Sequence, residues 1–384
     1  MDVRSNVYER RSLGDVCTLQ RGFDLPTKNR NPGEYALVTS SGPTDMHDEA
    51  RVTGPGVVTG RSGSIGNVFF IEGDFWPLNT TLYVKDFHGN DERYVFYLLQ
   101  YFDLGKFASG AGVPTLNRNH VHSESVQVAC NLDEQKRIVA LLDQAFAALD
   151  RARAHVEANL ADAIELKNCC VESALSSNML GELESVGPHV NLLTGFAFKS
   201  GGYTEGPEDI RLVRGDNIVQ GEFRWDGVKR WPVSDRANYE KYELARDDVL
   251  IAMDRTWISA GIKYAIVDEA ALPSLLVQRV ARLRSKPSLL PRYLAYWIGS
   301  KFFERYVLSI QTGLGVPHVS GSQIENFLIR VPSISEQEAV LDRLDRIMER
   351  QDSLVFAYRR KLADLADLRQ SLLQKAFSGN LMPD

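Results

Sequence analysis

The sequence predicts an α+β protein in which two pseudo-two-fold related α/β domains, joined by two long antiparallel coiled-coil helices, form a dumbbell. Two long segments with helical apolar periodicity, each opening on a Glu-Gln pair, lie in the middle and at the end of the 384 residues. A mixed segment with short β-type runs precedes each of them. The two mixed segments also share landmarks in the same order, which indicates an internal repeat.

The first domain is expected over residues 1–131. Short runs rich in β-branched and aromatic residues, at 35–38, 56–59 and 67–71, alternate with clusters of Gly, Pro, Asn and Ser. This pattern is typical of strands joined by loops. Residues 93–101 then have the continuous apolar character of a short buried helix.

A central helix is expected over residues 132–181. Asp133 is a candidate N-cap, Glu134 opposes the positive end of the helix dipole, and Gly181 is a typical C-terminal stop. Apolar residues recur at alternating three- and four-residue steps, and the polar Asn159 takes one of these positions. The expected helix–helix seam includes Leu142, Leu149, Val156 and Leu166.

The second domain, over residues 182–333, has the same make-up as the first. Strand-like runs occur at 210–213, 248–252 and 264–267, again separated by turn-forming residues. The sequence therefore predicts a second small α/β domain rather than an extension of the central helix.

The C-terminal helix is expected over residues 334–384, with Ser335 as its candidate N-cap and Glu336 in its first turn. Both long helices exceed the roughly 20 residues at which globular helices usually end, so length favours a rod over an ordinary core helix pair. Gln351 is the polar position in this second seam. The seam includes Leu344, Met348, Val355, Leu362 and Leu365.

The two halves of the chain match in order. The matched pairs are Gly22 with Gly195, Leu37-Val38 with Leu212-Val213, Val57-Val58 with Val249-Leu250, Arg93-Tyr94 with Arg292-Tyr293, the Gly-Val-Pro runs at 112–114 and 315–317, and Glu134-Gln135 with Glu336-Gln337. Their separation grows from 173 residues (195 minus 22) to 202 (336 minus 134), so loop-sized insertions distinguish the halves. If a two-fold axis relates them, the helices run antiparallel and hold the domains at opposite ends of roughly 65–70 Å of helix.

Composition indicates a protein with two or more globular domains, because 44% of the residues are hydrophobic and 24% are charged. No apolar run approaches the roughly 18 residues of a membrane span, and no signal sequence opens the chain, so a cytoplasmic protein without a membrane partner is expected. The four cysteines have no zinc or disulfide spacing. The net charge of −6 excludes a protein that coats nucleic acid through a basic excess, although it allows a local basic cleft.

Taken together, these landmarks resemble the specificity subunit of type I restriction-modification systems of bacteria and archaea. The most specific features are the two Glu-Gln helix openings and the run Ala-Phe-Ser-Gly-Asn-Leu at 376–381. The loop Arg-Ser-Gly-Ser-Ile-Gly at 61–66 and the two Gly-Val-Pro runs complete the set. The resemblance covers essentially the whole chain, and the repeated order makes it stronger than any one motif.

The resemblance implies a DNA-reading subunit without catalytic activity. Two target-recognition domains would each read one half of an asymmetric, bipartite site in double-stranded DNA, and the two spacer helices would set the distance between the halves. The helices would also dock two methyltransferase subunits, which restriction and translocase subunits would join. Adenine methylation from S-adenosylmethionine, and cleavage with ATP and Mg²⁺, would belong to these partners, so no cofactor or metal is expected in this chain.

The motifs in the sequence fit a chain that has no catalytic activity of its own. The run 105–107 is Gly-Lys-Phe, without the Ser or Thr of a phosphate-binding loop. The run 31–33 is Asn-Pro-Gly, without the second proline of the amino-methyltransferase motif. His120 and His122 have no further metal ligand at suitable spacing, so a surface or loop role is expected for both.

Polar and cationic residues in the loops are the candidates for DNA contact, because Arg, Lys, Asn, Gln and Ser supply both phosphate contacts and base-edge hydrogen bonds. In the first domain the candidates are Arg21, Lys28, Arg30, Ser40, Ser41, Arg61, Ser62, Asn117, Arg118 and Asn119. In the second domain they are Lys199, Arg214, Asp216, Asn217, Arg255, Trp257, Lys263, His318 and Ser320. Arg61 and Arg255 lead the two sets, because each follows a strand into a polar loop at what the sequence suggests are corresponding positions.

Three rival interpretations are compatible with parts of the sequence. A nuclease fused to a coiled coil would need clustered acidic metal ligands near a lysine, and the sequence offers no convincing set. A coiled-coil interaction scaffold that does not bind DNA is mildly favoured by the acidic net charge. A related specificity subunit of a methylation-only or other defence system would look the same in sequence, and its neighbouring genes would distinguish it.

Overall fold

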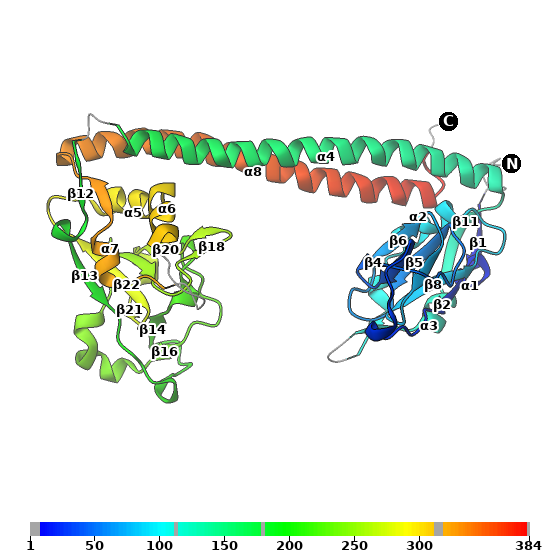
Figure 1. The fold of residues 1–384 in the computed structure, drawn as a ribbon, viewed down its shortest axis with the longest axis horizontal. Helices are drawn as coiled ribbons and strands as arrows, with labels where there is room; N and C mark the ends of the chain where they lie inside the picture. The colour runs from blue at the N-terminus through cyan, green and yellow to red at the C-terminus, as the bar shows by residue number, and fades with distance from the viewer. Residues whose placement is uncertain (1–7, 111–113, 178–180, 311–317, 382–384) are drawn as a thin grey trace. The chain divides into compact units, whose positions relative to one another are not determined.

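The protein folds into two compact units. The computed structural model describes residues 8–110, 114–177, 181–310 and 318–381. Unit 1 comprises Met1–Ala158 and Tyr358–Asp384, and unit 2 comprises Asn159–Ala357. Each unit therefore contains one α/β domain, part of helix α4 (Leu132–Leu175) and part of helix α8 (Ile334–Phe377) (Figure 1). Among the described residues, no helix is both long enough and apolar enough to cross a membrane.

The domain of unit 1 is built on a four-stranded antiparallel sheet with the order β2-β8-β5-β6. In a second sheet, β3 pairs antiparallel with β4 and parallel with β7, and helix α2 (Glu92–Phe102) packs against β5 and β6. The strands are β1 (Tyr8–Ser12), β2 (Thr18–Arg21), β3 (Tyr35–Thr39), β4 (Gly42–His47), β5 (Gly56–Gly60), β6 (Val68–Ile71), β7 (Phe75–Pro77), β8 (Thr81–Asp86), β9 (Ala108–Ser109), β10 (Thr115–Leu116) and β11 (Ser125–Ala129). The short helices are α1 (Leu13–Val16) and α3 (Arg118–His122).

The domain of unit 2 has a five-stranded sheet with the order β13-β22-β17-β20-β15 and a three-stranded sheet with the order β16-β14-β21. Helix α5 (Pro291–Gly299) packs against the larger sheet and against α6 (Lys301–Ile310). The strands are β12 (Leu183–Ser185), β13 (Val190–Thr194), β14 (Ile210–Val213), β15 (Gln220–Gly221), β16 (Arg230–Trp231), β17 (Val249–Ala252), β18 (Trp257–Ile258), β19 (Gly261–Ile262), β20 (Tyr264–Ile266), β21 (Ser274–Leu276), β22 (Val280–Ser285) and β23 (Leu328–Arg330). One further helix is α7 (Gly321–Glu325).

The two domains share the backbone frame that the repeat predicts. Gly22 N–H donates to Thr81 O at 3.1 Å, and Gly195 N–H donates to Val280 O at 3.0 Å. A Cβ atom on either glycine would lie 2.2 Å from a backbone atom of the adjoining strand segment, so both positions need glycine. The parallel pairs β3–β7 and β14–β21 also align Leu37-Val38 with Leu212-Val213. Of the paired Gly-Val-Pro runs, only Pro114 lies within the described residues.

Both long helices are uninterrupted over 44 residues, which corresponds to about 66 Å each. The helices begin at the expected residues, Leu132 and Ile334, but the expected N-caps Asp133 and Ser335 are wrong, because each cap lies two residues earlier. Glu134 N–H donates to Asn131 Oδ1 at 2.8 Å, which makes Asn131 the cap of α4. At α8 the cap is Ser333, whose N–H donates back to Glu336 Oε2 at 2.9 Å.

The two helices run antiparallel where they pair within each unit. In unit 1, Arg369 of α8 contacts Asp150 of α4 at 2.9 Å. In unit 2, Lys167 of α4 contacts Asp352 of α8 at 2.7 Å. The two residue numbers add to 519 in both ion pairs, so the same register describes the pairing in each unit.

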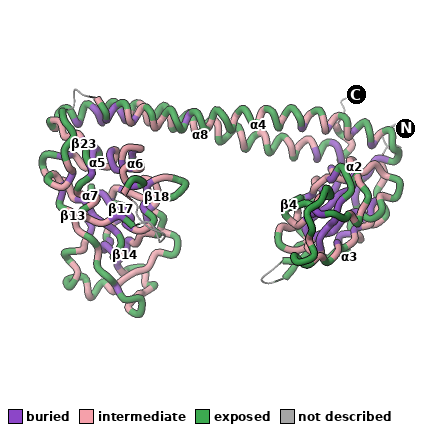
Figure 2. The backbone as a smooth tube through the Cα atoms, viewed as in Figure 1, coloured by how far each residue is buried: buried purple, intermediate pink, exposed green. Residues whose placement is uncertain are grey.

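The seam follows the expected residues along α8 but departs from them along α4. Leu166 is 50% exposed, and Asn159 is exposed as well, so the seam expected at these positions is wrong. The buried face passes instead through Leu160, Ala163 and Lys167. Leu160 and Lys167 each follow an expected seam position, Asn159 and Leu166, by one residue, and the three- and four-residue steps of the pattern are kept. The other expected seam residues are buried or half-buried, namely Leu142, Leu149, Val156, Leu344, Met348, Val355, Leu362 and Leu365 (Figure 2).

A buried glutamine fastens the first turn of each long helix to its own domain. Gln135 is 2% exposed. Its Oε1 accepts from Asp91 N–H at 2.9 Å, and its Nε2 donates to Asn90 Oδ1 at 2.7 Å and to Ala129 O at 3.0 Å. Every polar group of the side chain thus finds a partner, as a buried amide requires.

Gln337 makes the same attachment in unit 2, where it is fully buried. Its Oε1 accepts from Leu290 N–H at 2.8 Å, and its Nε2 donates to Ser288 O at 2.9 Å and Pro332 O at 2.8 Å. We call Gln135 and Gln337 the glutamine anchors. They explain why the Glu-Gln pair recurs at both helix openings.

A second attachment lies eight residues beyond each glutamine anchor. Arg93 of α2 contacts Asp143 of α4 at 2.9 Å, and Tyr97 donates a hydrogen bond to the same carboxylate. In unit 2, Arg292 contacts Asp345 at 2.6 Å, and Tyr296 donates to it. Two attachments about two turns apart fix the direction of each helix on its own domain.

Replacing Gln135 or Gln337 by alanine is expected to destabilise the protein by about 2–3 kcal/mol, because each change leaves a buried N–H and two carbonyl-type acceptors without partners. Thermal unfolding of the purified chain, followed by circular dichroism, measures this loss. Gln144→Ala is the matched control, since Gln144 is exposed on the same helix, and it should change stability by less than about 0.5 kcal/mol. Equal stabilities of the anchor and control variants would contradict the role of the anchors.

Candidate nucleic-acid interface

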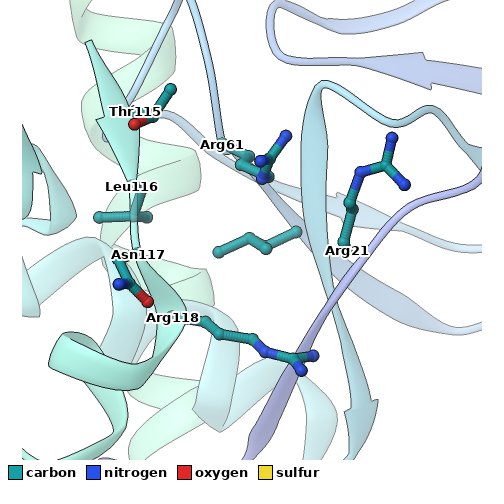
Figure 3. Close-up of a pocket in the computed structure, with 7 residues that line it drawn as sticks. Arg21, Arg61, Thr115, Leu116, Asn117 and Arg118 are labelled. Atoms are coloured by element: carbon teal, nitrogen blue, oxygen red, sulfur yellow. The ribbon is translucent and has the colours of Figure 1, made fainter. Parts of the chain in front are cut away.

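Three arginines from separate parts of unit 1 surround one hollow. Arg21 ends β2, Arg61 follows β5, and Arg118 begins α3. They line a cavity of about 380 Å³ together with Leu82 and residues 115–117 (Figure 3). The sheet order brings them together, because β2 and β5 both flank β8. We call this cavity the three-arginine hollow.

Asn79 and Asp24 hold two of these arginines in place. Arg21 Nη2 donates to Asp24 Oδ1 at 2.9 Å, and Asn79 Nδ2 donates to the same oxygen at 2.5 Å. The hydrogen bond from Asn79 and, to a smaller extent, the one from Arg21 hold the pKa of the Asp24 carboxyl below its ordinary value. Asn79 O also accepts from Arg61 Nη1 at 3.4 Å, so one residue helps to position two guanidinium groups.

Helix α3 positions Arg118. Asn117 caps the helix by accepting from Asn119 N–H at 3.0 Å, and Arg118 Nη1 donates to Leu19 O at 3.3 Å. On the same helix, Nε2 of His122 accepts a hydrogen bond from Leu19 N–H at a distance of 2.9 Å. Burial, followed by the charges of Arg118 and His88, lowers the pKa of His122. The neutral imidazole therefore ties α3 to the strand that carries Arg21.

The other candidates of unit 1 lie outside the lining of the hollow. Lys28 is exposed on the turn after β2, and Arg30 donates to Leu25 O at 3.3 Å. Ser40 and Ser41 form the β3–β4 turn, where Ser41 Oγ lies 3.2 Å from Ser64 Oγ. Ser62 makes a bridge to Thr115, and Asn119 lies exposed on α3.

In unit 2 two of the basic candidates, His318 and Arg214, lie beside aspartates. His318 Nδ1 lies 2.8 Å from Asp254 Oδ1, and Arg279 Nε lies 3.7 Å from Asp254 Oδ2. Arg214 pairs with Asp216 at 3.7 Å. Lys263 is half-buried, and burial lowers the pKa of its ammonium group.

The structure contradicts the expectation that the Asn217 side chain contacts DNA. Asn217 is 2% exposed, its Oδ1 accepts from Arg214 N–H at 3.1 Å, and its Nδ2 donates to Arg224 O at 3.1 Å. The side chain is used to close the turn after β14 and offers no free group to DNA, so it is not a contact residue in this fold.

The remaining candidates of unit 2 differ in their surroundings. Ser320 is the N-cap of α7, and Trp257 packs on the core of unit 2. Lys199 is exposed.

Arg61 and Arg255 do not occupy corresponding positions, contrary to the sequence expectation. Leu116 N–H donates to Arg61 O at 2.8 Å, and the matching bond in unit 2 joins Val319 N–H to Met253 O at 2.9 Å. Met253 is therefore the counterpart of Arg61. Arg255 corresponds to Gly63, and both have positive φ angles, +47° and +83°. Arg255 is therefore an exposed residue on a left-handed backbone, whereas Arg61 directly follows strand β5.

Sequence reasoning missed Asp24, Asn79 and Arg279. Asp24 stands three residues after Arg21, and this spacing was an available signal for an ion pair. Asn79 and Arg279 offered none, because they join their partners only through the packing of distant strands. Within the described residues, no group of three or more His, Cys, Asp or Glu side chains is placed to hold a metal ion.

The family model of the type I restriction modification DNA specificity domain matches the chain twice, over residues 6–158 and 203–355. The specificity subunit of the type I restriction enzyme EcoAI from Escherichia coli is 34% identical over 174 residues, which span 44% of this chain and 29% of that subunit. The MjaVIII specificity subunit from Methanocaldococcus jannaschii is 22% identical over 304 residues, which span 76% of this chain and 70% of that subunit. The alignment thus spans less than a third of the length of the EcoAI subunit.

Solved structures share the fold over nearly the full length. A chain from a study of complex assembly and conformational transition of the type I R-M system superposes with a TM-score of 0.74 at 16% identity, covering 98% of both chains. The HsdS subunit from Thermoanaerobacter tengcongensis gives a TM-score of 0.51 at 18% identity, covering 97% of both chains. The arrangement of two α/β domains with two long helices is therefore an established fold.

Unit 1 is expected to lose stability as the pH falls below about 6.5, the ordinary pKa of histidine. The pKa of His122 is lowered in the folded protein, so the unfolded chain binds the proton more readily. The contribution of the neutral His122 to folding stability is therefore fully present above pH 6.5 and is lost progressively below it. The melting temperature measured from pH 7.5 to 5.5 shows this loss. His122→Gln, which keeps an acceptor for Leu19 N–H, should have a shallower pH dependence, and identical dependences of the two proteins would contradict the assignment.

Proposed function

Because the chain belongs to the family of type I restriction-modification DNA specificity domains, we propose that it is the DNA-reading subunit of a type I restriction-modification complex. Each unit reads one half of an asymmetric, bipartite site in double-stranded DNA. The chain itself carries no catalytic step. Adenine methylation with S-adenosylmethionine belongs to two methyltransferase subunits, and cleavage with ATP and Mg²⁺ belongs to restriction subunits.

The double match to the family model carries this proposal, because it assigns one specificity domain to each half of the chain. The three-arginine hollow supports it, since clustered guanidinium groups are a typical feature of nucleic-acid contact surfaces. The lack of counterparts for these arginines in unit 2 supports an asymmetric site. Two domains with one frame and different polar side chains would read different bases.

The two helices are proposed as the spacer and as the docking platform for the methyltransferase subunits. Each domain is fastened to its own helix by a glutamine anchor and by an Arg–Asp pair. Each helix is uninterrupted over 44 residues. A rigid attachment of this kind converts helix length into a fixed spacing between half-sites, as subunit geometry does in dimeric DNA-binding proteins.

Methylation mapping tests the proposed function. Cells that express this chain with its cognate methyltransferase should methylate adenine within a motif of two unlike, defined halves separated by unspecified base pairs. The expected control is the methyltransferase alone, which should give no such motif. A continuous or palindromic motif, or no motif-specific methylation by the complex, would overturn the proposal.

A paired deletion tests the spacer. Removing residues 150–156 from α4 and 363–369 from α8 keeps the pairing register, because the matched residue numbers add to 519. Loss of seven residues shortens a helix by about 10 Å, so the unspecified spacer should shorten by at most about three base pairs. Deleting 150–156 alone breaks the register and should abolish methylation. An unchanged spacer in the paired deletion would rule out the helices as the ruler.

A further inference from the structure

The guanidinium groups of the three-arginine hollow have most of their hydrogen-bonding capacity free. A guanidinium carries five N–H donors. Arg61 and Arg118 each donate to a single backbone carbonyl, at 3.4 Å and 3.3 Å, both at the long limit of a hydrogen bond. In the described part of the chain, no carboxylate lies within ion-pair distance of either one. Both groups are thus available to an external acceptor.

The hollow concentrates positive charge on an acidic chain. Asp24 is the carboxylate beside it, and it compensates Arg21 alone, so three guanidinium groups and one carboxylate leave a charge of about +2 at the hollow. The whole chain has a formal net charge of −6. A cationic hollow of about 380 Å³ in such a chain is a specific local feature rather than a consequence of composition.

Among the described residues of unit 2, none of the three positions that correspond to Arg21, Arg61 and Arg118 holds an arginine. The shared backbone hydrogen bonds pair Arg61 with Met253, and the equivalence of Gly22 with Gly195 pairs Arg21 with the preceding Thr194. The caps of α3 and α7 pair Arg118 with Gly321. All three counterparts are uncharged.

Because Gly321 takes the place of Arg118, α7 also carries no side chain at this position. Several basic side chains of unit 2 have carboxylate partners. His318 and Arg279 face Asp254, and Arg214 faces Asp216.

We propose that the three-arginine hollow binds a backbone phosphate of the DNA half-site read by unit 1, and that unit 2 lacks an equivalent phosphate pocket. The inference rests on the proposed function and deepens it. Its consequence is that the salt-dependent part of the binding free energy is concentrated on the half-site of unit 1.

A phosphate fits the arrangement better than a base edge does. A base edge is flat, and one arginine reads it with two parallel hydrogen bonds. Here three guanidinium groups approach from three separate segments of the chain, which suits an anion with acceptor oxygens in several directions. Arg61 and Arg118 each donate one hydrogen bond to a backbone carbonyl, so further N–H groups of both remain available to such a ligand.

The test measures the affinity of the complex with its cognate methyltransferase for duplex DNA that carries the mapped site, at several salt concentrations. Arg61→Ala and Arg118→Ala should each weaken binding by roughly tenfold. Each should also reduce the slope of log K against log salt concentration by about 1, because one phosphate contact is lost. Arg61→Lys keeps the charge and should retain most of the slope.

Arg10→Ala is the matched control. Arg10 is an exposed arginine on β1 of the same unit and does not line the hollow, so its replacement should leave the slope unchanged. Unchanged slopes in Arg61→Ala and Arg118→Ala, or an altered methylation motif at an unchanged slope, would overturn the phosphate assignment in favour of base reading or no contact. Specific binding by the parent complex in the same assay shows that the proposed function holds in either case.

A change in the DNA keeps the test independent of protein folding. Neutral methylphosphonate groups placed one at a time should weaken binding of the parent complex strongly at one phosphate of the unit 1 half-site. At that phosphate the substitution should have little further effect on Arg61→Ala, since the contact is already lost. Additive losses at every phosphate, or the strongest effect in the half-site of unit 2, would refute the inference.

Discussion

The geometry of each unit depends on a buried glutamine in the first turn of a long helix. A buried amide without partners is destabilising, and Gln135 and Gln337 avoid this only where the helix start, the preceding strand and the N-terminus of α2 or α5 meet in one arrangement. The Arg93–Asp143 and Arg292–Asp345 pairs then set the direction of each helix. A polar interaction thus defines a single docking geometry that apolar packing alone would leave adjustable.

The shared frame and the differing side chains have separate physical origins. Backbone hydrogen bonds and two obligatory glycines keep the strands of both domains in the same places. Such bonds do not depend on which side chains the loop ends carry, so one unit can have Arg61 at the position where the other has Met253. This independence explains how one fold supports two different recognition surfaces in one chain.

Periodicity and motif order predicted the two helices, the repeat and the domain plan, because these features depend on local sequence. The details that failed depend on three-dimensional context. The apolar periodicity placed Leu166 in the seam, whereas the structure exposes it and half-buries the next residue, Lys167. Sequence position paired Arg61 with Arg255, yet the strand register pairs Arg61 with Met253. The three-arginine hollow was not predictable as a site, because its members come from residues nearly 100 positions apart, from Arg21 to Arg118.

Each domain, fixed by its anchor to its own helix, is proposed to read its half-site independently of the other. Replacing residues 182–333 by a second copy of residues 1–131 keeps both glutamine anchors and gives two identical reading domains on antiparallel helices. The methylation motif of this duplicated chain, expressed with the cognate methyltransferase, tests the claim most directly. Independent reading should give an inverted repeat in which both halves are the half-site of unit 1. A motif that retains the original asymmetric halves would contradict it.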